Sequence, residues 1–281
     1  MTSIKIKYNL SGGEFKTLSK GEIIFERSDA LQKQPVFFIA AGLVRLQYLL
    51  ADGSEFKYYV ESGSVFGIEE CVQGIFRLCD AVAAEKTQIY LWDLESYYQA
   101  SEGSPKLAIN SIRSLSRLLR IMNSEYGDLL TQANEEAQLM KSQDELEADT
   151  MMDVTTKLPL PQGNSRQVFK NRQVLIKEGD LPERVFWILS GEVLITRKME
   201  KSYKVLAKAG KGELVGEMSF FDKSLSSATV VANGEVQAMV FSQENFKELF
   251  YANSKWTKQL LSRLSTRVVN MVQQLTRYAC C

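Results

Sequence analysis

The strongest constraint on the fold is an internal repeat. Apolar runs, glycines and aromatic positions in the first half of the chain recur 149 residues later. The matched pairs are Gly42 and Gly191, Gly67 and Gly216, and Trp92 and Phe241. Further upstream, Asp29 and Asp180 lie 151 residues apart, so the first copy carries two extra residues before Val36. Self-similarity at a fixed period is the signature of a repeated structural unit, and we expect two copies of one domain.

Composition places the chain among ordinary globular proteins. Its 281 residues suit two domains, and 45% of them are hydrophobic while 24% are charged. The formal net charge of zero gives no overall attraction to nucleic acid or to a membrane. The apolar run Val36–Val44 is too short to span a bilayer, and the first residues lack the apolar core of a signal peptide. We therefore expect a cytoplasmic protein that contacts neither DNA nor membrane.

The residues for common enzyme chemistries are missing. The chain contains no histidine, which removes Ser-His-Asp and Cys-His catalysis and the usual ligands of β-barrel metal enzymes. Cys71, Cys79, Cys280 and Cys281 form no C-x-x-C pair, so a zinc site is not expected. We expect neither a catalytic residue nor a metal, and we interpret the cysteines as free thiols.

Each copy is predicted to contain short strands separated by glycine turns. The strands expected in the second copy are 173–180, 185–189, 192–196, 203–206 and 235–241, with tight turns at 190–191 and 210–212. Many short strands with glycine turns indicate a closed or double-sheet barrel, which hides the edges of its sheets.

A Gly-Glu pair lies at the centre of the second copy. Gly216 lets the backbone turn closely, and 218–221 is expected to form a short helix directly after it. The free N–H groups of a helix start attract an anion. A short polar loop and the β-branched run beginning at Thr229 follow. This order resembles the phosphate-binding cassette of the cyclic nucleotide-binding domain family.

The resemblance implies a role for particular residues. In that family the Glu of the pair accepts the ribose 2′-hydroxyl, and an Arg ten residues after the Gly binds the cyclic phosphate. The second copy has Glu217 but Ser226 at the Arg position, whereas the first copy has Arg77 but Ile68 at the Glu position. Glu69 lies one residue late. The implied nucleotide-binding residues are Phe66, Gly67, Glu69 and Arg77, and Val215, Gly216, Glu217, Met218, Ser226 and Ser227.

The resemblance covers roughly residues 15–125 and 168–275 and implies a mixed α and β fold. The expected architecture is two tandem β-roll, jelly-roll-like barrels, each followed by long α-helices. We divide the chain into a first cyclic nucleotide-binding-like domain at 1–103 and a long helical segment at 104–140. An acidic and Pro-containing connector follows at 141–167, and a second domain with a C-terminal helix at 168–281.

Two helical segments carry apolar seams with coiled-coil-like spacing. The seam residues are Ile112, Leu115, Leu119, Met122, Tyr126 and Leu129, and Leu261, Leu264, Val268, Met271 and Leu275. Such a seam forms a homodimer, pairs the two helices within one chain, or packs on its own barrel. The excess of acids at 125–149 and of bases at 249–281 fits either pairing or two solvated faces.

We therefore predict a non-enzymatic regulatory or adaptor protein that responds to cAMP or cGMP and acts through a downstream protein partner. One alternative is a scaffold whose pockets no longer bind nucleotide. A second is a transcription regulator of the catabolite-activator type, disfavoured because too few residues follow Leu275 for a helix-turn-helix. A third is a kinase regulatory subunit, disfavoured because residues 1–19 contain no basic cluster.

Overall fold

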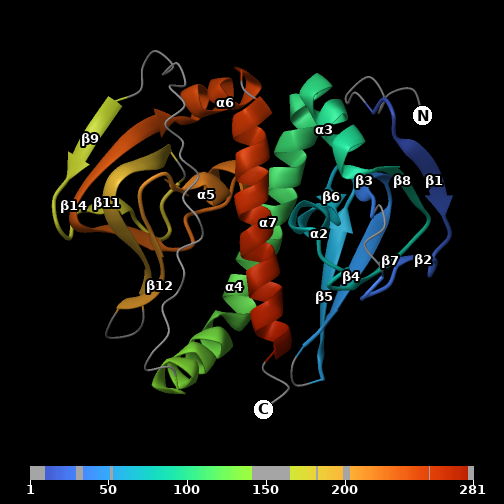
Figure 1. Ribbon diagram of the computed structural model, residues 1–281, viewed down its shortest axis with the longest axis horizontal. Coiled ribbons are helices and arrows are strands. Elements are labelled where there is room, and N and C mark those ends of the chain that lie inside the picture. Colours follow the sequence, from blue (N-terminus) through green and yellow to red (C-terminus); the bar gives the residue numbers. More distant parts are fainter. Residues whose placement is uncertain are drawn as a thin grey trace. The chain divides into compact units, whose positions relative to one another are not determined.

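The structure, a computed structural model, describes residues 10–29, 34–50, 53–140, 165–181, 183–198, 203–252 and 254–277. The chain divides into two compact units. The first unit comprises Met1–Ala133 together with Asn253–Cys281, and the second comprises Asn134–Ala252. Each unit contains its own set of antiparallel strands (Figure 1).

Two four-stranded sheets make up the β-roll of the first unit. One sheet has the order β1 (Glu14–Leu18), β8 (Thr87–Trp92), β3 (Val36–Ala41) and β6 (Val65–Phe66). The other has the order β2 (Ile23–Phe25), β7 (Asp80–Ala83), β4 (Leu43–Leu49) and β5 (Glu55–Glu61). In β4, buried and partly exposed side chains alternate, which is the period-2 pattern of a strand with one face on the core.

Aromatic side chains fill the end of this roll next to α2 (Ile68–Gln73). The rings of Phe37 and Phe66 are stacked with centroids 4.9 Å apart, and Phe25 packs against both. All three side chains are buried. Phe66 is therefore part of the hydrophobic core.

The first unit also contains α3 (Leu94–Gly103), the part of α4 (Pro105–Met140) up to Ala133, and α7 (Ser254–Arg277). Asp93 caps α3 by accepting the backbone N–H of Ser96 at 2.8 Å. Pro105 is the first residue of α4, where its missing N–H costs nothing. Helix α4 then continues to Met140.

Helix α7 follows the second copy in sequence but packs in the first unit, against α2. Gln73 donates a hydrogen bond to Thr266 at 2.9 Å. Lys258 forms an ion pair with Glu102 of α3 at 2.8 Å and lies over the ring of Tyr98. This differs from the sequence-based division, which placed the C-terminal helix with the second domain, because the apolar seam of α7 does not specify which barrel it covers.

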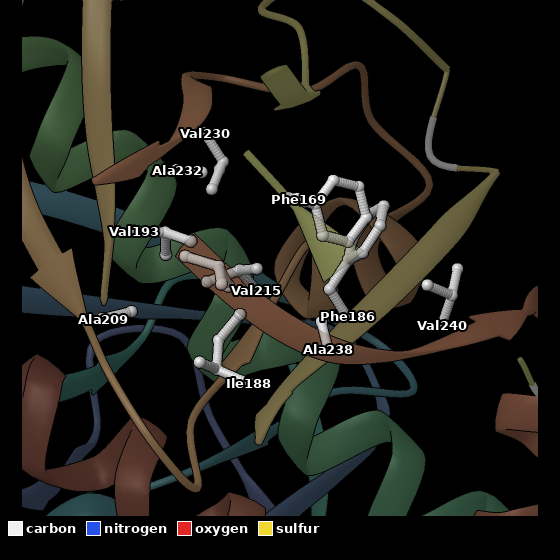
Figure 2. Close-up of a cluster of buried hydrophobic side chains, with 11 residues drawn as sticks. Phe169, Phe186, Ile188, Val193, Ala209, Val215, Val230, Ala232, Ala238 and Val240 are labelled. Carbon is white, nitrogen blue, oxygen red and sulfur yellow. The ribbon is translucent and has the colours of Figure 1, made fainter. Parts of the chain in front are cut away.

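The second unit contains one six-stranded antiparallel sheet and two helices, α5 (Glu217–Asp222) and α6 (Gln243–Ala252). The strands are β9 (Ser165–Phe169), β10 (Val174–Ile176), β11 (Arg184–Lys198), β12 (Tyr203–Ala209), β13 (Leu214–Val215) and β14 (Thr229–Ser242). Small and β-branched side chains from these strands fill the interior, and the rings of Phe169 and Phe186 meet edge to face (Figure 2).

One expected turn is an irregularity within a single strand. The sequence predicts two strands joined by a tight turn at 190–191, but β11 runs through this region as one strand. Gly191 has φ +83°, and the register with β14 shifts on either side of Ser190. A Cβ at Gly191 would lie 2.3 Å from the Glu235 carbonyl oxygen, so the close approach of β14 requires glycine here.

The two copies match in backbone detail. In the first, Phe37 pairs with Phe66 and with Leu91; in the second, the residues 149 positions later, Phe186, Val215 and Val240, pair in the same way. Gly42 and Gly191, and likewise Gly67 and Gly216, all have positive φ. The predicted tandem repeat and the mixed α and β fold are thus confirmed.

Several sequence-based expectations concern residues outside the described part. These are most of the connector 141–167, Cys280 and Cys281, and the side chains of Tyr126 and Leu129. Over the described residues, none of the helices is both long and apolar enough to cross a membrane.

Candidate functional site

The second cassette has the backbone that the sequence predicts. Gly216 ends β13 with φ +87°, and α5 begins at the next residue. A Cβ on Gly216 would lie 2.9 Å from Ile176 Cδ1 and 3.0 Å from the Arg184 carbonyl oxygen. Both the backbone angle and the lack of space therefore require glycine at this turn.

Glu217 is the first residue of α5 and only 4% exposed. Val215, one of its predicted companions, is a core residue, and Figure 2 shows it among the apolar side chains inside the roll. Met218 and Ser227 are half-buried. The cassette thus holds a carboxylate almost out of solvent, beside an apolar interior.

Ser226 occupies the Arg position of the second cassette and is 7% exposed. Its backbone N–H donates to the Asp180 carbonyl at 2.9 Å, and its carbonyl accepts the Gly179 N–H at 2.8 Å. These two bonds fix the loop against the turn after β10. In the second copy, the position that the family fills with a guanidinium presents a neutral hydroxyl.

In the first cassette the Gly turn is conserved between the copies, with φ +70° at Gly67. The following position, Ile68, is fully buried, so the carboxylate that the family places there is replaced by an apolar side chain. A Cβ on Gly67 would lie 2.6 Å from Arg77 Nη1. Gly67 and Arg77, two of the residues that the resemblance assigns to nucleotide binding, therefore lie in contact.

The guanidinium of Arg77 is buried and occupied by groups of the chain itself. Nη1 donates to the Gly67 carbonyl at 2.7 Å and forms an ion pair with Glu70 Oε2 at 3.3 Å. Nη2 donates to the Pro35 carbonyl at 2.6 Å. The carbon of the guanidinium lies 4.3 Å from the centroid of the Phe25 ring, within the range of a cation–π interaction.

Glu69, the predicted substitute for the missing Glu, is 3% exposed. Among the described residues, its Oε2 has no hydrogen-bond partner. Burial, together with the nearby charge of Glu70, raises the pKa of Glu69 to about 8, against the smaller opposing effects of the backbone N–H groups of Glu69 and Ile68 and of the Arg77 charge. Glu69 is therefore protonated at neutral pH.

A small cavity of about 10 Å³ lies between this cassette and α4. Its walls include Phe66 and Glu69 on one side and Ser114 and Leu118 of α4 on the other. Such a volume holds about one water molecule. Space for a nucleotide at this place requires α4 to move.

Helix α4 is attached to the roll above this cavity. Ser114 Oγ accepts the backbone N–H of Val65 at 3.1 Å, and Asn110 Nδ2 donates to the Gly63 carbonyl at 2.6 Å. Sequence reasoning did not identify Glu70 or Ser114. A carboxylate seven residues before Arg77 was a visible signal for the first, but no sequence pattern pointed to the second.

No cluster of three or more potential metal ligands occurs in the portion of the chain that the structure describes. The two cassettes therefore offer carboxylates, hydroxyls, one guanidinium and backbone groups. Groups of these kinds are hydrogen-bond donors and acceptors for polar ligands.

Comparison with known proteins agrees with this reading. The family model for the cyclic nucleotide-binding domain matches residues 15–103 and 166–253. The cyclic AMP receptor protein of Thermus thermophilus is 29% identical over 85 residues, which cover 30% of this chain and 39% of that protein. The cAMP-activated global transcriptional regulator CRP of Salmonella typhimurium is 25% identical over 107 residues, covering 37% and 49%. The matched segments thus span less than half of these relatives.

Among solved structures, the regulatory domain of Toxoplasma gondii PKA, co-crystallised with cAMP, aligns with 91% of this chain and 86% of its own. The sequence identity is 14% and the TM-score is 0.33.

Proposed function

Because the chain belongs to the cyclic nucleotide-binding domain family, we propose that it is a regulatory protein that binds a cyclic nucleotide through its second domain. The observation that carries this assignment is the placement of Glu217, almost buried and directly after the positive-φ Gly216. The family resemblance gives this carboxylate to the ribose 2′-hydroxyl. In the first domain the corresponding residue is apolar Ile68, and the guanidinium of Arg77 is already occupied.

The second domain is expected to bind more weakly than a cassette that carries both residues. A hydrogen bond to a charged group contributes about 1.5–3 kcal/mol and a neutral one about 0.5–1.5 kcal/mol. Ser226 in place of Arg therefore costs about 1–2 kcal/mol, or roughly five- to thirtyfold in the dissociation constant. We expect binding of cAMP or cGMP that is measurable but weaker than that of a cassette with both residues.

The proposed role is regulation without catalysis in the cytoplasm, with a downstream protein that reads the nucleotide-dependent state. The complete lack of histidine supports the non-enzymatic part. The seam residues Ile112, Leu119, Leu261 and Val268 are buried within the chain, which favours an intramolecular role for both seams over a homodimer. Sedimentation of the purified protein at several concentrations tests that preference.

The direct test is isothermal calorimetry and thermal unfolding of the full chain with cAMP and with cGMP. We expect one site per chain, loss of binding in Glu217→Ala, and unchanged binding in Arg77→Lys. The matched control is Glu248→Ala, which removes an exposed carboxylate from α6 of the same unit. Retained affinity in Glu217→Ala would refute the assignment to the second cassette.

A second candidate is a scaffold that binds no nucleotide. The engaged guanidinium of Arg77 favours it in the first domain, and Ser226 favours it in the second. No heat and no shift in melting temperature at millimolar cAMP or cGMP would select this alternative.

A further inference from the structure

The buried ion pair in the first domain joins two residues of one cassette. Glu70 lies on α2, and Arg77 follows in the loop before β7. Both side chains are 1% exposed. The second carboxylate oxygen of Glu70 accepts the backbone N–H of Leu78 at 3.2 Å, so the carboxylate bridges the guanidinium and the loop backbone.

The Glu70 carboxylate binds the guanidinium of Arg77, the group to which the family resemblance assigns phosphate binding. A guanidinium forms directional bonds with carboxylates and with phosphates alike. Nη1 of Arg77 also donates to the Gly67 carbonyl, Nη2 donates to the Pro35 carbonyl, and the Phe25 ring lies against the guanidinium. Glu70 supplies the only negative charge paired with Arg77 within the described residues. An external anion that takes over the ion pair at Nη1 has to displace Glu70.

The second copy provides an internal comparison. The residues 149 positions after Glu70 and Arg77 are Ser219 and Ser226. The backbone is equivalent at this point: the Ser28 N–H donates to the Arg77 carbonyl, as the Gly179 N–H does to that of Ser226. The carboxylate and the guanidinium are thus present together in one copy and absent together from the other, which indicates that they act as a unit.

Helix α4 also covers the cassette of the first domain. Helix α4 is hydrogen-bonded to the roll through Ser114 and Asn110, and the space beneath it is about 10 Å³. The first domain therefore combines a satisfied Arg77 with a covered pocket.

We propose that Glu70 is a built-in counter-ion that takes the place of a ligand phosphate on Arg77 and keeps the first domain closed without nucleotide. The proposal rests on the proposed function only in treating Arg77 as the family's phosphate-binding residue. Its consequence is specific: removing the Glu70 charge turns Arg77 into an anion site that accepts phosphate or the cyclic phosphodiester of a nucleotide.

The test uses the full chain with Glu217→Ala, so that a response of the second domain does not contribute. Glu70→Gln is added to this parent, and melting temperature is followed with inorganic phosphate and, separately, with cAMP. We expect a melting temperature several degrees below the parent that rises with either anion, and at least tenfold tighter anion binding than in the parent. A response to phosphate but not to cAMP would mean that α4 still excludes the nucleoside.

Two further variants separate charge from packing. Glu70→Gln with Arg77→Met is expected to melt higher than Glu70→Gln alone and to ignore both anions, because no buried charge remains unpaired. Glu26→Gln removes an exposed carboxylate of the same domain and is expected to behave like the parent.

The proposal is overturned if folded Glu70→Gln protein melts like the parent or responds to neither anion. If Glu70→Gln does not fold in chloride buffer, refolding in phosphate buffer of equal ionic strength decides. Recovery in phosphate alone supports a built-in counter-ion, and failure in both buffers refutes an anion site. Nucleotide binding by the second domain is measured separately with the wild-type chain. If the second domain does not bind nucleotide, the Glu70→Gln results still test the counter-ion proposal.

Discussion

Glu69→Gln provides a quantitative test of the buried cassette in the first domain. The Glu69 carboxyl is 3% exposed and lines the small cavity under α4. Burial and the Glu70 charge raise its pKa from 4.5 to about 8. Glutamine has nearly the same shape as the protonated acid but does not titrate, so the variant isolates the cost of keeping this acid neutral.

The direction of the change in unfolding free energy with pH follows from the number of protons bound by the folded and unfolded chains. Between pH 4.5 and pH 8 the unfolded chain has lost the Glu69 proton while the folded chain retains it. The free energy of unfolding then falls by about 1.4 kcal/mol per pH unit, because the unfolded state binds fewer protons. Above the folded pKa both states are ionised and the loss levels off. Integrated over this interval, the wild-type chain loses on the order of 5 kcal/mol that Glu69→Gln retains.

The assay is denaturant unfolding at a series of pH values from about 5 to about 8, with both proteins in the Trp187→Phe background. The remaining tryptophans, Trp92 and Trp256, both lie in the first unit, so their fluorescence reports on that unit. We expect Glu69→Gln to be close to wild type at the acidic end and increasingly more stable as pH rises. Glu61→Gln, which removes an exposed carboxylate at the end of β5, is the control.

A difference in unfolding free energy that does not change with pH would contradict the burial argument. A Glu69→Gln protein less stable than wild type near pH 8 would contradict it more strongly, because the charged carboxylate would then be contributing stabilising interactions.

The remaining predictions concern the turns and the last helix. Gly74→Ala, with nothing within 4 Å of the new Cβ, should lose only about 1–2 kcal/mol of backbone energy in denaturant unfolding. Gly67→Ala should cost more than Gly74→Ala, because its new Cβ would also lie 2.6 Å from a buried guanidinium nitrogen of Arg77; an equal cost would contradict this. Lys223→Gly should raise the unfolding free energy by about 0.5–1 kcal/mol, because a residue with φ +58° carries backbone strain that glycine lacks; a lower midpoint would contradict this. Lys258→Ala should cost about 0.2–1 kcal/mol at low salt, through the lost ion pair with Glu102, and less at high salt; a cost independent of salt would indicate packing instead.

Local spacing made the fold predictable. The sequence predicted the close turn at Gly216, the short helix after it and the long helical segment that follows the first copy, because these depend on neighbouring residues and on backbone sterics. The resemblance assigned both Gly67 and Arg77 to nucleotide binding, and the two residues lie in contact. The continuous β11 was not predicted, since a glycine at a close strand contact and a glycine in a turn have the same sequence signature.

The sequence by itself determined that one barrel design occurs twice and which residues form each cassette, because a repeat fixes the order of strands and turns whatever the side chains later contact. Only the tertiary structure decided what those side chains do. It pairs Glu70 with Arg77, buries the side chain of Glu69 and packs α7 against α2. Pairing and burial depend on which groups arrive together from distant segments, and the resulting loss of solvent sets the strength and protonation of each charge.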